Sequence, residues 1–518
     1  MDNIKNMYRD YIGDLHLNLH PDQLDLLPKW YEFCKKKVDF FTLAYYPYTM
    51  KKMDCGFDYE IELNDNEYVS QWEIIRKFLL EENKKDDFVT FIGFEWQGTG
   101  EDGDHNVYFK GLENAMISLP KRYNELKNIY ENQSVIAIPH HLAYSLGNRG
   151  KNWDTHDEHF SPYVETYSHH GSSEGENTNL AMNRHIHMGP RVDNTSVIQG
   201  LKQGYHFGII ASGDNHEVPA MVKNGRAGVW AKEYSSEGLW EAMINRRVYG
   251  FTDSKISTWI ECDGHPMGSV FGTTNSSSCL KVYAVANGKI NRIELYKNGE
   301  LDEIKLVRKC KIPNSGRVRM KFKLEYGWGP NVKYFPEESI KTWKGLVSTD
   351  ADILSVETIY SSFENDYTLV DAHHLSFKGE SQKLSGTHWM RDSSMRTEGI
   401  IIELYGDIDS VVEININNQI RKTTIDELIK HGDLIVYEDD AKKLLENRTG
   451  LTHFYRSDAW YHNAYKAKIY QGVLSEEYMI EESFVLTNSN QEDSYFVKII
   501  QDDGQVAWSS PIWIRKAT

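Results

Sequence analysis

Histidines and carboxylates gather beside short apolar runs in the first half of the chain. Thirteen of the 20 histidines lie at or before His216. Five segments place such side chains in sequence order: residues 13–20, 93–96, 104–106, 139–141 and 212–216. The last four follow or adjoin runs that are typical of buried strands, for example residues 88–92 and 135–138. Imidazoles and carboxylates delivered from separate strand ends predict a metal site for zinc, manganese or iron.

Length, charge and cysteine content limit what the chain can be. A chain of 518 residues is longer than a single hydrophobic core usually accommodates, so we expect two or more domains. A formal net charge of −18 disfavours a broad nucleic-acid surface, which needs clustered Lys and Arg. The five cysteines are widely spaced and form no Cys-x-x-Cys pair, so they predict neither a disulfide framework nor a zinc ribbon.

The chain carries no sign of membrane attachment. No apolar run approaches the ~20 residues that span a bilayer, and residues 1–6 lack the apolar stretch of a secretory signal. We therefore expect a soluble, cytoplasmic protein with neither a membrane nor a nucleic-acid partner. A signal peptide removed before the first residue would leave the same sequence, and the oligomeric state stays open.

The pattern of apolar residues changes near residue 255. Residues 1–255 alternate short apolar runs with helix-like stretches at residues 28–36, 67–82, 120–131 and 235–244, which is the pattern of βα units. Residues 256–518 carry alternating or β-branched runs, such as 280–285 and 317–322, punctuated by turn signals. We therefore predict an α/β barrel over residues 1–255, followed by an antiparallel β-sandwich-like domain over 256–518. We expect residues 334–391 to hold long loops or an insertion that reaches the first domain.

Six short motifs, in this order, resemble one family. They are Gly13-Asp14-Leu15-His16, Gly93-Phe94-Glu95-Trp96, Asn106-Val107 directly after His105, Asp214-Asn215-His216, Arg246-Arg247-Val248-Tyr249-Gly250 and the Ala-Trp-Ser-Ser-Pro-Ile-Trp of residues 507–513. The first domain resembles the polymerase and histidinol phosphatase (PHP) superfamily of metal-dependent hydrolases, and most closely a PHP-like branch catalogued as a domain of unknown function. The resemblance implies a distorted (β/α)7 barrel, a β-rich accessory domain and a phosphoester as substrate class.

The resemblance also implies a set of metal ligands. His16 matches the first histidine of the family's His-x-His, Glu95 its bridging carboxylate, His105 and His140 two further histidines, and Asp214 and His216 the closing Asp-x-His. His20 corresponds to another histidine near the first motif, and His141 stays open as an alternative to His140. Asn18 stands where a second histidine is expected, and residues 44–46 read Ala-Tyr-Tyr where the family has Thr-Asp-His. We therefore expect one or two divalent ions (Zn, Mn or Fe) and not three.

Such a centre activates water. A carboxylate such as Glu95 can hold two cations ~3.5–4 Å apart and lower the pKa of a bound water towards ~7. Asp214 or His216 can accept a proton from that water or orient it, and His170 can donate one to the leaving group. His170 is preferred to His169 because Gly171 beside it favours a tight backbone approach. The alternative is that both histidines lie in a surface loop.

A basic stretch offers contacts to an anionic substrate. Residues 183–191 include Arg184 and Arg191, and a guanidinium group grips phosphate or carboxylate bidentately. Structural ion pairs in an acidic protein are the alternative. We predict Arg184, Arg191 and Asn18 as substrate-binding residues for a small-molecule or saccharide-type substrate.

The sequence thus predicts a metal-dependent hydrolase that acts on a phosphoester through metal-activated water, with an ester, carbamate or amide as the next choice. The competing hypothesis is a non-catalytic protein that binds carbohydrate or a partner and retains a degraded site. It is favoured by the absence of the expected histidines, since Asn18 and Tyr46 stand in their places. A lyase that uses His and Tyr side chains is a more remote alternative. Because Glu95, His140 and Asp214 are retained together with His105 and His216, we favour the enzyme.

Overall fold

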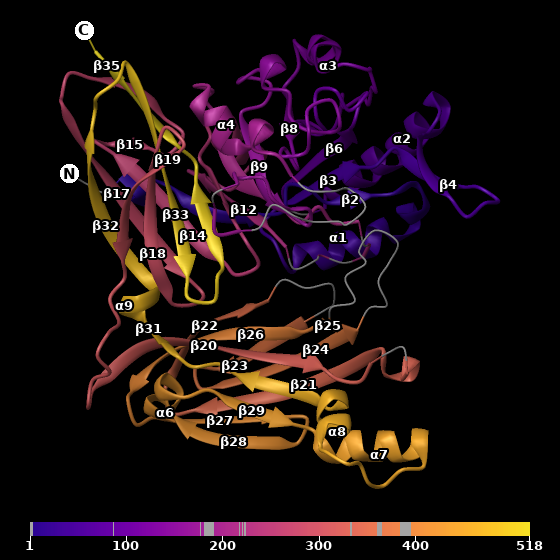
Figure 1. Cartoon of the computed structure of the whole chain (residues 1–518), viewed down its shortest axis with the longest axis vertical. Coiled ribbons are helices and arrows are strands. Elements are labelled where there is room, and N and C mark those ends of the chain that lie inside the picture. The colour runs from indigo at the N-terminus through magenta and orange to yellow at the C-terminus, as the bar shows by residue number, and fades with distance from the viewer. Residues whose placement is uncertain are drawn as a thin grey trace. The chain divides into compact units, whose positions relative to one another are not determined.

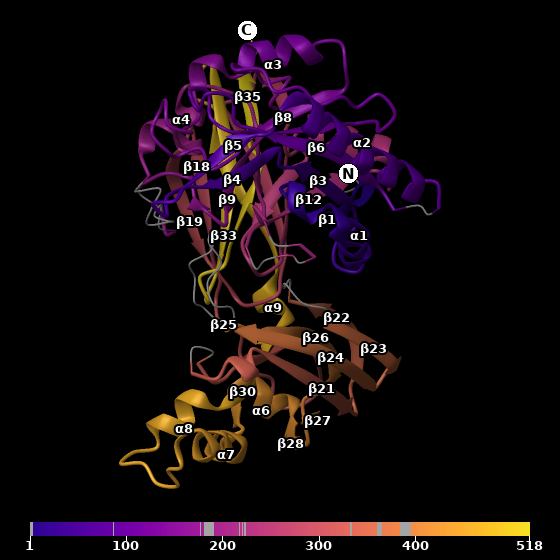
Figure 2. The same ribbon diagram turned by 90° about the vertical axis from the view of Figure 1, so that its right-hand side faces the viewer.

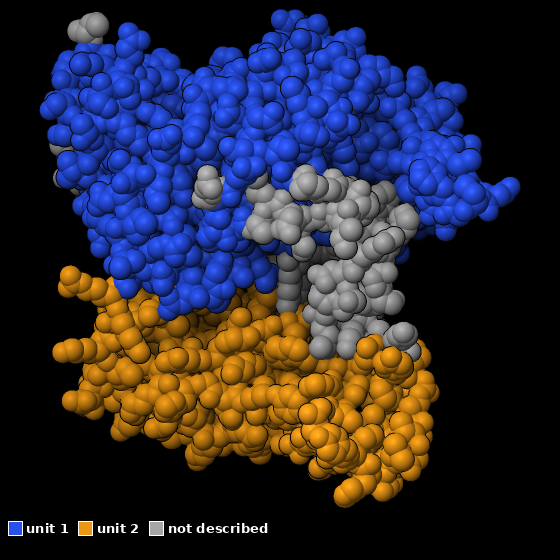
Figure 3. Space-filling model, in the orientation of Figure 1, with its two compact units in different colours: residues 1–286, 290–307, 480–518 blue, residues 287–289, 308–479 orange. Residues whose placement is uncertain are grey.

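The computed structural model describes residues 4–85, 88–176, 178–180, 191–216, 218–219, 221, 224–331, 334–359, 365–383 and 395–517. They belong to two compact units (Figures 1 and 3). Unit 1 comprises residues 1–286, 290–307 and 480–518, and unit 2 comprises residues 287–289 and 308–479. The chain therefore contributes residues 287–289 to unit 2, builds the rest of that unit with residues 308–479, and returns to unit 1 for its last strands.

Five strands between residues 18 and 139 build one mixed sheet of unit 1. Its strand order is β2 (Asn18–Leu19), β3 (Phe41–Tyr45), β6 (Thr90–Trp96), β7 (His105–Phe109) and β8 (Val135–Pro139). β2, β3 and β6 pair in parallel, which requires crossover connections, whereas β6, β7 and β8 pair antiparallel. β3, β6, β7 and β8 are buried along their whole length, so other elements cover both of their faces.

Helices form close to where the sequence predicts them. α1 (Leu27–Lys35), α2 (Asp65–Glu82), α3 (Tyr123–Tyr130) and α5 (Ser236–Ile244) confirm the four predicted helices, and α4 (Val197–Lys202) adds a short one. α2 begins at a capping box, in which the Asn64 side chain accepts a hydrogen bond from the Glu67 amide at 3.2 Å and the Glu67 carboxylate accepts one from the Asn64 amide at 3.4 Å. Its buried side chains recur every three or four residues: Tyr68, Trp72, Ile75 and Leu79. None of the described helices combines the length and the apolar character needed to cross a bilayer.

Strands from both ends of the chain share a second sheet of unit 1. It runs β1 (Arg9–Gly13), β12 (Arg226–Ala231), β13 (Val248–Phe251), β34 (Val506–Ser509), β33 (Glu492–Gln501), β18 (Ile290–Lys297) and β19 (Glu300–Leu306), with β16 (Val270–Thr273) and β35 (Ile512–Lys516) attached. A three-stranded sheet has the order β10 (Gly171–Ser172), β9 (Tyr163–Ser168), β11 (Gly208–Ala211). A four-stranded sheet has the order β15 (His265–Pro266), β14 (Ile256–Cys262), β17 (Ser277–Ala286), β32 (Met479–Thr487). β4 (Tyr48–Lys52) and β5 (Asp58–Glu62) form a separate hairpin.

The pairings among the described strands show no closed barrel, so the predicted distorted (β/α)7 barrel is not confirmed. β7 and β8 interrupt the parallel βα pattern by pairing antiparallel, and it resumes in a separate sheet, where β9 and β11 pair in parallel with α4 between them. The boundary predicted between residues 255 and 256 falls inside unit 1, since β14, β17 and β18 are built there. The sequence changes at that point from alternating strand-like and helix-like stretches to strand-like runs, but the compact unit continues.

Unit 2 is an antiparallel sandwich of two sheets (Figures 1 and 2). One sheet holds β22 (Asp352–Thr358), β26 (Glu398–Asp407), β20 (Arg317–Trp328), β30 (Tyr465–Ile469), β29 (Asp433–Val436) and β31 (Val473–Leu474). The other holds β23 (Asn365–Asp371), β24 (His374–Lys383), β21 (Ile340–Thr349), β27 (Val411–Ile416), β28 (Gln419–Thr424) and β25 (Met395–Arg396). Phe322, Trp343 and Ile414 contribute to a core shared by the two sheets.

Four helices complete unit 2: α6 (Ile425–Lys430), α7 (Glu438–Thr449), α8 (Asp458–Asn463) and α9 (Ser475–Tyr478). α7 and α8 lie together at one end of the sandwich (Figure 2). The described part of residues 334–391 forms β21 to β24, where we expected long loops or an insertion that reaches the first domain; residues 360–364 and 384–391 lie outside the described residues.

The last strands of the chain pack on the α/β part of unit 1. Phe496, Trp508 and Trp513 share one hydrophobic core with Val164 and Ile209. A buried ion pair joins the same parts, because Lys498 Nζ lies 2.6 Å from Glu174 Oε2. The C-terminal strands are therefore integral to this unit.

His206 makes a second charged connection between these parts. Its Nε2 lies 2.7 Å from Glu492 Oε1, at the start of β33, and its Nδ1 lies 3.4 Å from Glu158 Oε2. Burial lowers the pKa of His206, but the two carboxylates outweigh it and raise the pKa above its usual value. The pair of contacts is therefore strongest when His206 is protonated.

We predict that His206→Gln destabilises the protein more at pH 5.5 than at pH 9. Because the folded-state pKa is raised, the stabilisation is fully present below the unfolded-state pKa of about 6.5 and is lost as the pH rises through the folded-state pKa. Urea denaturation should show a loss of about 1 kcal/mol at pH 5.5 that shrinks towards zero at pH 9. His453→Gln, at an exposed position of unit 2, serves as the control. A loss for His206→Gln that is equal at both pH values would contradict the charged contact.

Candidate metal centre

The register of the mixed sheet decides which side chains can meet. Glu95 lies opposite Asn106, whereas its neighbour Trp96 lies opposite His105. Residues directly opposite in an antiparallel pair point to the same face, and successive residues point to opposite faces. Glu95 and His105 therefore project from opposite faces of the sheet.

His105 is consequently not brought into the centre, which corrects its prediction as a ligand. Its Nδ1 lies 2.9 Å from the carbonyl oxygen of Gly103, and its Nε2 lies 3.3 Å from Lys151 Nζ. Lys151 lies over the ring of Tyr123, and burial lowers the pKa of this lysine to about 7. His105 thus belongs to a separate buried contact group.

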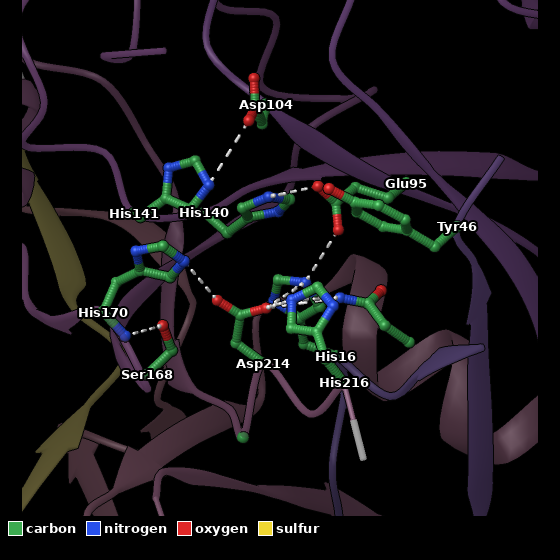
Figure 4. A network of polar contacts seen from close by, with 12 residues as sticks. His16, Tyr46, Glu95, Asp104, His140, His141, Ser168, His170, Asp214 and His216 are labelled. Carbon is green, nitrogen blue, oxygen red and sulfur yellow. Dashed lines mark hydrogen bonds and ion pairs between the residues drawn. The ribbon is translucent and has the colours of Figure 1, made fainter. Parts of the chain in front are cut away.

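His16, Glu95 and His140 form a compact buried group (Figure 4). His16 Nε2 lies 3.4 Å from Glu95 Oε2, and His140 Nε2 lies 3.7 Å from Glu95 Oε1. The ligand atoms of the three residues all lie within 4.8 Å of one another. Donors around a tetrahedral metal at 2.0–2.1 Å stand about 3.3–3.4 Å apart. The spacing therefore suits one transition-metal ion.

His140 is the member of this group that most clearly fits a metal. Its side chain is buried, and among the described residues neither of its ring nitrogens makes a hydrogen bond. Buried polar atoms nearly always have a partner, and imidazole nitrogen is a common metal ligand. This group contains His140 and not His141, but which of the two histidines binds a metal stays a prediction.

Glu165 orients His16. Its Oε2 lies 2.8 Å from His16 Nδ1, so the other ring nitrogen is the one that faces Glu95. Metal-binding histidines usually have such a carboxylate partner, which fixes the tautomer and the ring. Burial lowers the pKa of His16, but Asp214, Glu165 and Glu95 outweigh it and raise the pKa well above its usual value. Protons and a metal ion will therefore compete for His16.

Asp214 brings a second carboxylate to His16. Its Oδ1 lies 3.2 Å from His16 Nε2 and 3.1 Å from His216 Nε2. Asn18 Nδ2 lies 3.4 Å from the same oxygen and 3.3 Å from His216 Nε2. His20 Nε2 lies 2.7 Å from His216 Nδ1, and burial together with His216 lowers the pKa of His20 to about 3. The structure thus brings Asn18, His20, Asp214 and His216 together beside His16.

His170 reaches the other oxygen of Asp214. Its Nε2 lies 2.9 Å from Asp214 Oδ2, and its Nδ1 lies 2.9 Å from the hydroxyl of Tyr144. Burial lowers the pKa of His170 well below its usual value, although Asp214 opposes this effect. The lowered pKa favours the neutral form of His170, and its role as a proton donor to the leaving group stays a prediction.

The two predicted arginines do not form an anion site in the described residues. Arg191 is buried, donates to the carbonyl oxygen of His170 and to Ser173 Oγ at 2.8 Å, and lies over the ring of Tyr144. It supports the His170 segment and its prediction as a substrate contact is corrected. Arg184 lies outside the described residues.

A second group of possible ligands adjoins the first and shares His140 with it. It consists of Asp104, His140 and His141. His141 Nε2 lies 3.5 Å from Asp104 Oδ2. Arg149 contacts both residues, since its Nε donates to Asp104 Oδ2 at 2.7 Å and its Nη2 lies 3.2 Å from His141 Nε2. A guanidinium group thus stands at the atoms that would face an ion in this group.

Backbone conformation is constrained around the centre. Nine non-glycine residues in the described part of the chain have positive φ, and three of them are His141 (35°), Arg149 (71°) and Asp214 (51°). Left-handed backbone costs about 1 kcal/mol for such residues and persists where the surroundings impose it. Their position here indicates that the surrounding structure imposes the conformation of these three residues.

A cavity of about 360 Å³ lies next to the second group. Thr99, Gly100, Tyr144, Gly147, Asn148 and Arg149 line it. Its lining includes the Arg149 cation and several hydrogen-bonding groups but no carboxylate. Tyr144 connects the cavity to His170, and Arg149 connects it to Asp104.

The sequence reasoning missed several members of this network. Tyr46, at the position of the missing histidine, packs against His20 and His216 and donates to Glu60 Oε1 at 2.6 Å. Asp104, Glu165 and Arg149 were also missed, whereas His141 had been kept only as an alternative to His140. Asp104 stood inside the segment 104–106, and strand alternation was the signal that would have separated it from His105.

Asp14 fixes the two loops that carry His16 and Asp214. Its carboxylate accepts hydrogen bonds from the His16 amide at 3.0 Å and from the Gly213 amide at 3.0 and 3.1 Å. Arg226 Nη1 lies 2.9 Å from Asp14 Oδ2, and both side chains are fully buried. Burial raises the pKa of Asp14, whereas Arg226 lowers it. The ion pair therefore keeps a charged carboxylate in the interior.

Comparisons with known proteins give little further information. No family model matches the chain. An uncharacterised protein of Chlamydia pneumoniae is 25% identical over 252 residues, which cover 44% of this chain and 40% of that protein. A solved two-domain protein from Bacteroides vulgatus, described as containing a predicted PHP-like metal-dependent phosphoesterase, has a TM-score of 0.32 and 13% identity over 56% of this chain and 80% of that chain. The candidate function therefore depends on the side chains of the centre.

We predict that Arg226→Met lowers the free energy of unfolding by about 3 kcal/mol, because it leaves the Asp14 carboxylate buried without its counter-ion. Urea denaturation at pH 7 measures this loss. Arg317→Met is the control, since Arg317 and Asp352 form an ion pair whose side chains are 46% and 44% exposed, and removing it should cost less than about 1 kcal/mol. A similar small loss in both variants would show that the buried pair does not support the two loops.

Proposed function

We propose that this chain is a metal-dependent hydrolase, with its metal held by His16, Glu95 and His140. The observation that carries the proposal is this buried group, whose donors are spaced as metal ligands and include a histidine with two unbonded ring nitrogens. Imidazole and carboxylate ligands suit zinc, manganese or iron. A bound ion of this kind lowers the pKa of water to about 7 and so supplies a nucleophile at neutral pH.

The remaining side chains of the centre orient water and hold one another in position. Burial raises the pKa of Asp214, but His16 and His170 outweigh it, so the pKa lies well below its usual value. Asp214 is therefore an anion that can orient an incoming water molecule. Neutral His170 can donate its Nε2 proton to the Asp214 carboxylate, whose Oδ2 lies 2.9 Å away, and so holds that carboxylate in position. Tyr144 holds the other nitrogen of His170.

A phosphoester is the substrate class that we propose. The adjoining cavity offers the cation of Arg149 together with Asn148, Thr99 and Tyr144, and its lining includes no carboxylate. Such a lining favours a substrate that carries negative charge, because guanidinium groups bind phosphate oxygens strongly. Neutral esters, carbamates and amides gain less from this cation and come second.

We predict that Glu95→Gln loses the bound metal and the hydrolytic activity together. The amide keeps the shape of the side chain but removes the negative charge between His16 and His140, so hydrolysis should fall at least about 100-fold. Elemental analysis of protein reconstituted with zinc, manganese or iron measures the metal, and a panel of phosphomonoesters and phosphodiesters, followed by carboxylic esters, measures the activity.

Glu60→Gln is the matched control for this prediction. Glu60 is close to the centre through Tyr46, which it contacts at 2.6 Å, but it belongs to neither group of candidate ligands. Its variant should keep the metal. Retention of metal and activity in Glu95→Gln would contradict the proposed centre, and failure of the unaltered protein to bind metal after reconstitution would favour a non-catalytic binding protein.

A further inference from the structure

We propose that the guanidinium group of Arg149 takes the place of a second metal ion, so that the centre holds one ion, in the His16–Glu95–His140 group. This inference rests on the proposed function, since it concerns the same centre. It follows from three observations: the contacts of Arg149, the position of His140 in both groups, and the anchoring of the Arg149 backbone.

The contacts of Arg149 occupy the ligand atoms of the second group. Its Nε donates to Asp104 Oδ2 at 2.7 Å, and its Nη2 lies 3.2 Å from His141 Nε2. Because guanidinium nitrogens only donate, His141 must accept with Nε2 and is neutral. The carboxylate oxygen and the imidazole lone pair that a metal would need are therefore directed at Arg149.

His140 cannot serve both groups at once as a neutral ligand. It is a member of the group with His16 and Glu95 and also of the group with Asp104 and His141. A neutral imidazole offers one lone pair, because its other nitrogen carries a proton. Once His140 binds an ion beside Glu95, Asp104 and His141 are what the second group retains for another ion, and both already contact Arg149.

The backbone keeps Arg149 in this position. The Arg149 amide donates to the Gly100 carbonyl oxygen at 2.9 Å, and the residue has a φ of 71°. The following residue is held too, since the Gly150 amide donates to the Ser145 carbonyl oxygen at 3.2 Å. The side chain of Asp104 is fully buried, whereas that of Arg149 is 32% exposed. The guanidinium group therefore closes the second group on the side of the cavity that Arg149 lines.

This arrangement has a chemical consequence. In a two-metal centre the second ion supplies positive charge to the substrate and the leaving group. A fixed guanidinium group supplies positive charge and directional hydrogen bonds without depending on the supply of metal. The predicted centre is thus a single ion with a built-in cation beside it.

Metal stoichiometry tests the inference independently of activity. We expect elemental analysis of the full chain, loaded with zinc and freed of loosely bound ions, to give one equivalent per chain. Arg149→Met removes the guanidinium group but keeps an extended side chain, and should raise the value to two equivalents because Asp104 and His141 become open to an ion. Arg149→Lys keeps a cation and should give one.

Two further variants keep the test decisive. Asp104→Asn should retain the one equivalent, because Asp104 is not a ligand of the bound ion, whereas a two-metal centre would lose one of its two ions. Arg122→Met removes another arginine–aspartate contact, at 2.8 Å from Asp102, and should also give one equivalent. If Arg149→Met does not fold, the unaltered chain and Asp104→Asn still decide the matter.

The outcomes separate this inference from the proposed function. Two equivalents in the unaltered chain, or one equivalent in folded Arg149→Met, would overturn the role of Arg149 and leave a metal-dependent hydrolase standing. No bound metal in the unaltered chain, even after reconstitution, would overturn the proposed function itself. One equivalent that becomes two only in Arg149→Met would support both.

Discussion

The buried carboxylate of Asp14 is the contact on which the centre depends. It lies just after β1 and accepts hydrogen bonds from the amides of His16 and Gly213, so one side chain fixes the loops that carry His16 and Asp214. An anion in this position is tolerable only because Arg226, at the start of β12, shares the interior with it. β1 and β12 are neighbours in the nine-stranded sheet, so the register of this sheet fixes the positions of Asp14 and Arg226. Through Asp14 it also fixes the loops that carry the candidate ligands His16 and Asp214.

The centre that results has a clear division of charge. Glu95, Asp214 and Glu165 surround His16, and they make its protonated form favourable in the absence of a metal. On the other side of His140, the Arg149 cation stands with Asp104 and His141. A divalent ion therefore has a strong electrostatic preference for the side of His16. Both groups of candidate ligands consist of histidines and a carboxylate. Carboxylates surround the first group, whereas the Arg149 cation stands at the second.

Much of this could be read from the sequence, and the failures have physical causes. Local patterns predicted the helices, the buried strands and most of the ligand-bearing segments, because each pattern is complete within a few residues. The ligand role of His105 was wrong because neighbouring residues of a strand point to opposite faces, and only the register shows which face holds Glu95. Arg149 was missed since a lone arginine in a glycine-rich loop carries no signal until folding places it beside Asp104.

The barrel is not confirmed, and the predicted domain boundary falls inside unit 1, for related reasons. A βα texture predicts parallel strands, but pairing is non-local, and β7 and β8 return antiparallel. Likewise, the change of texture near residue 255 marks a change of element type, whereas the unit continues through β14, β17 and β18 and resumes at β32. Nothing in the local sequence indicates that strands 200 or more residues apart will share a sheet.

The return of the chain to unit 1 after residue 479 has a consequence for folding during synthesis. β33 and β34 stand between β13 and β18 in the nine-stranded sheet, so this sheet lacks its middle until residue 509 has been synthesised. Unit 2 is complete in sequence by residue 479 and can fold on the ribosome first, as domains commonly do during translation. Until the last strands emerge, the nascent chain must carry exposed sheet edges on either side of the gap, and these edges are where a molecular chaperone would have most reason to bind.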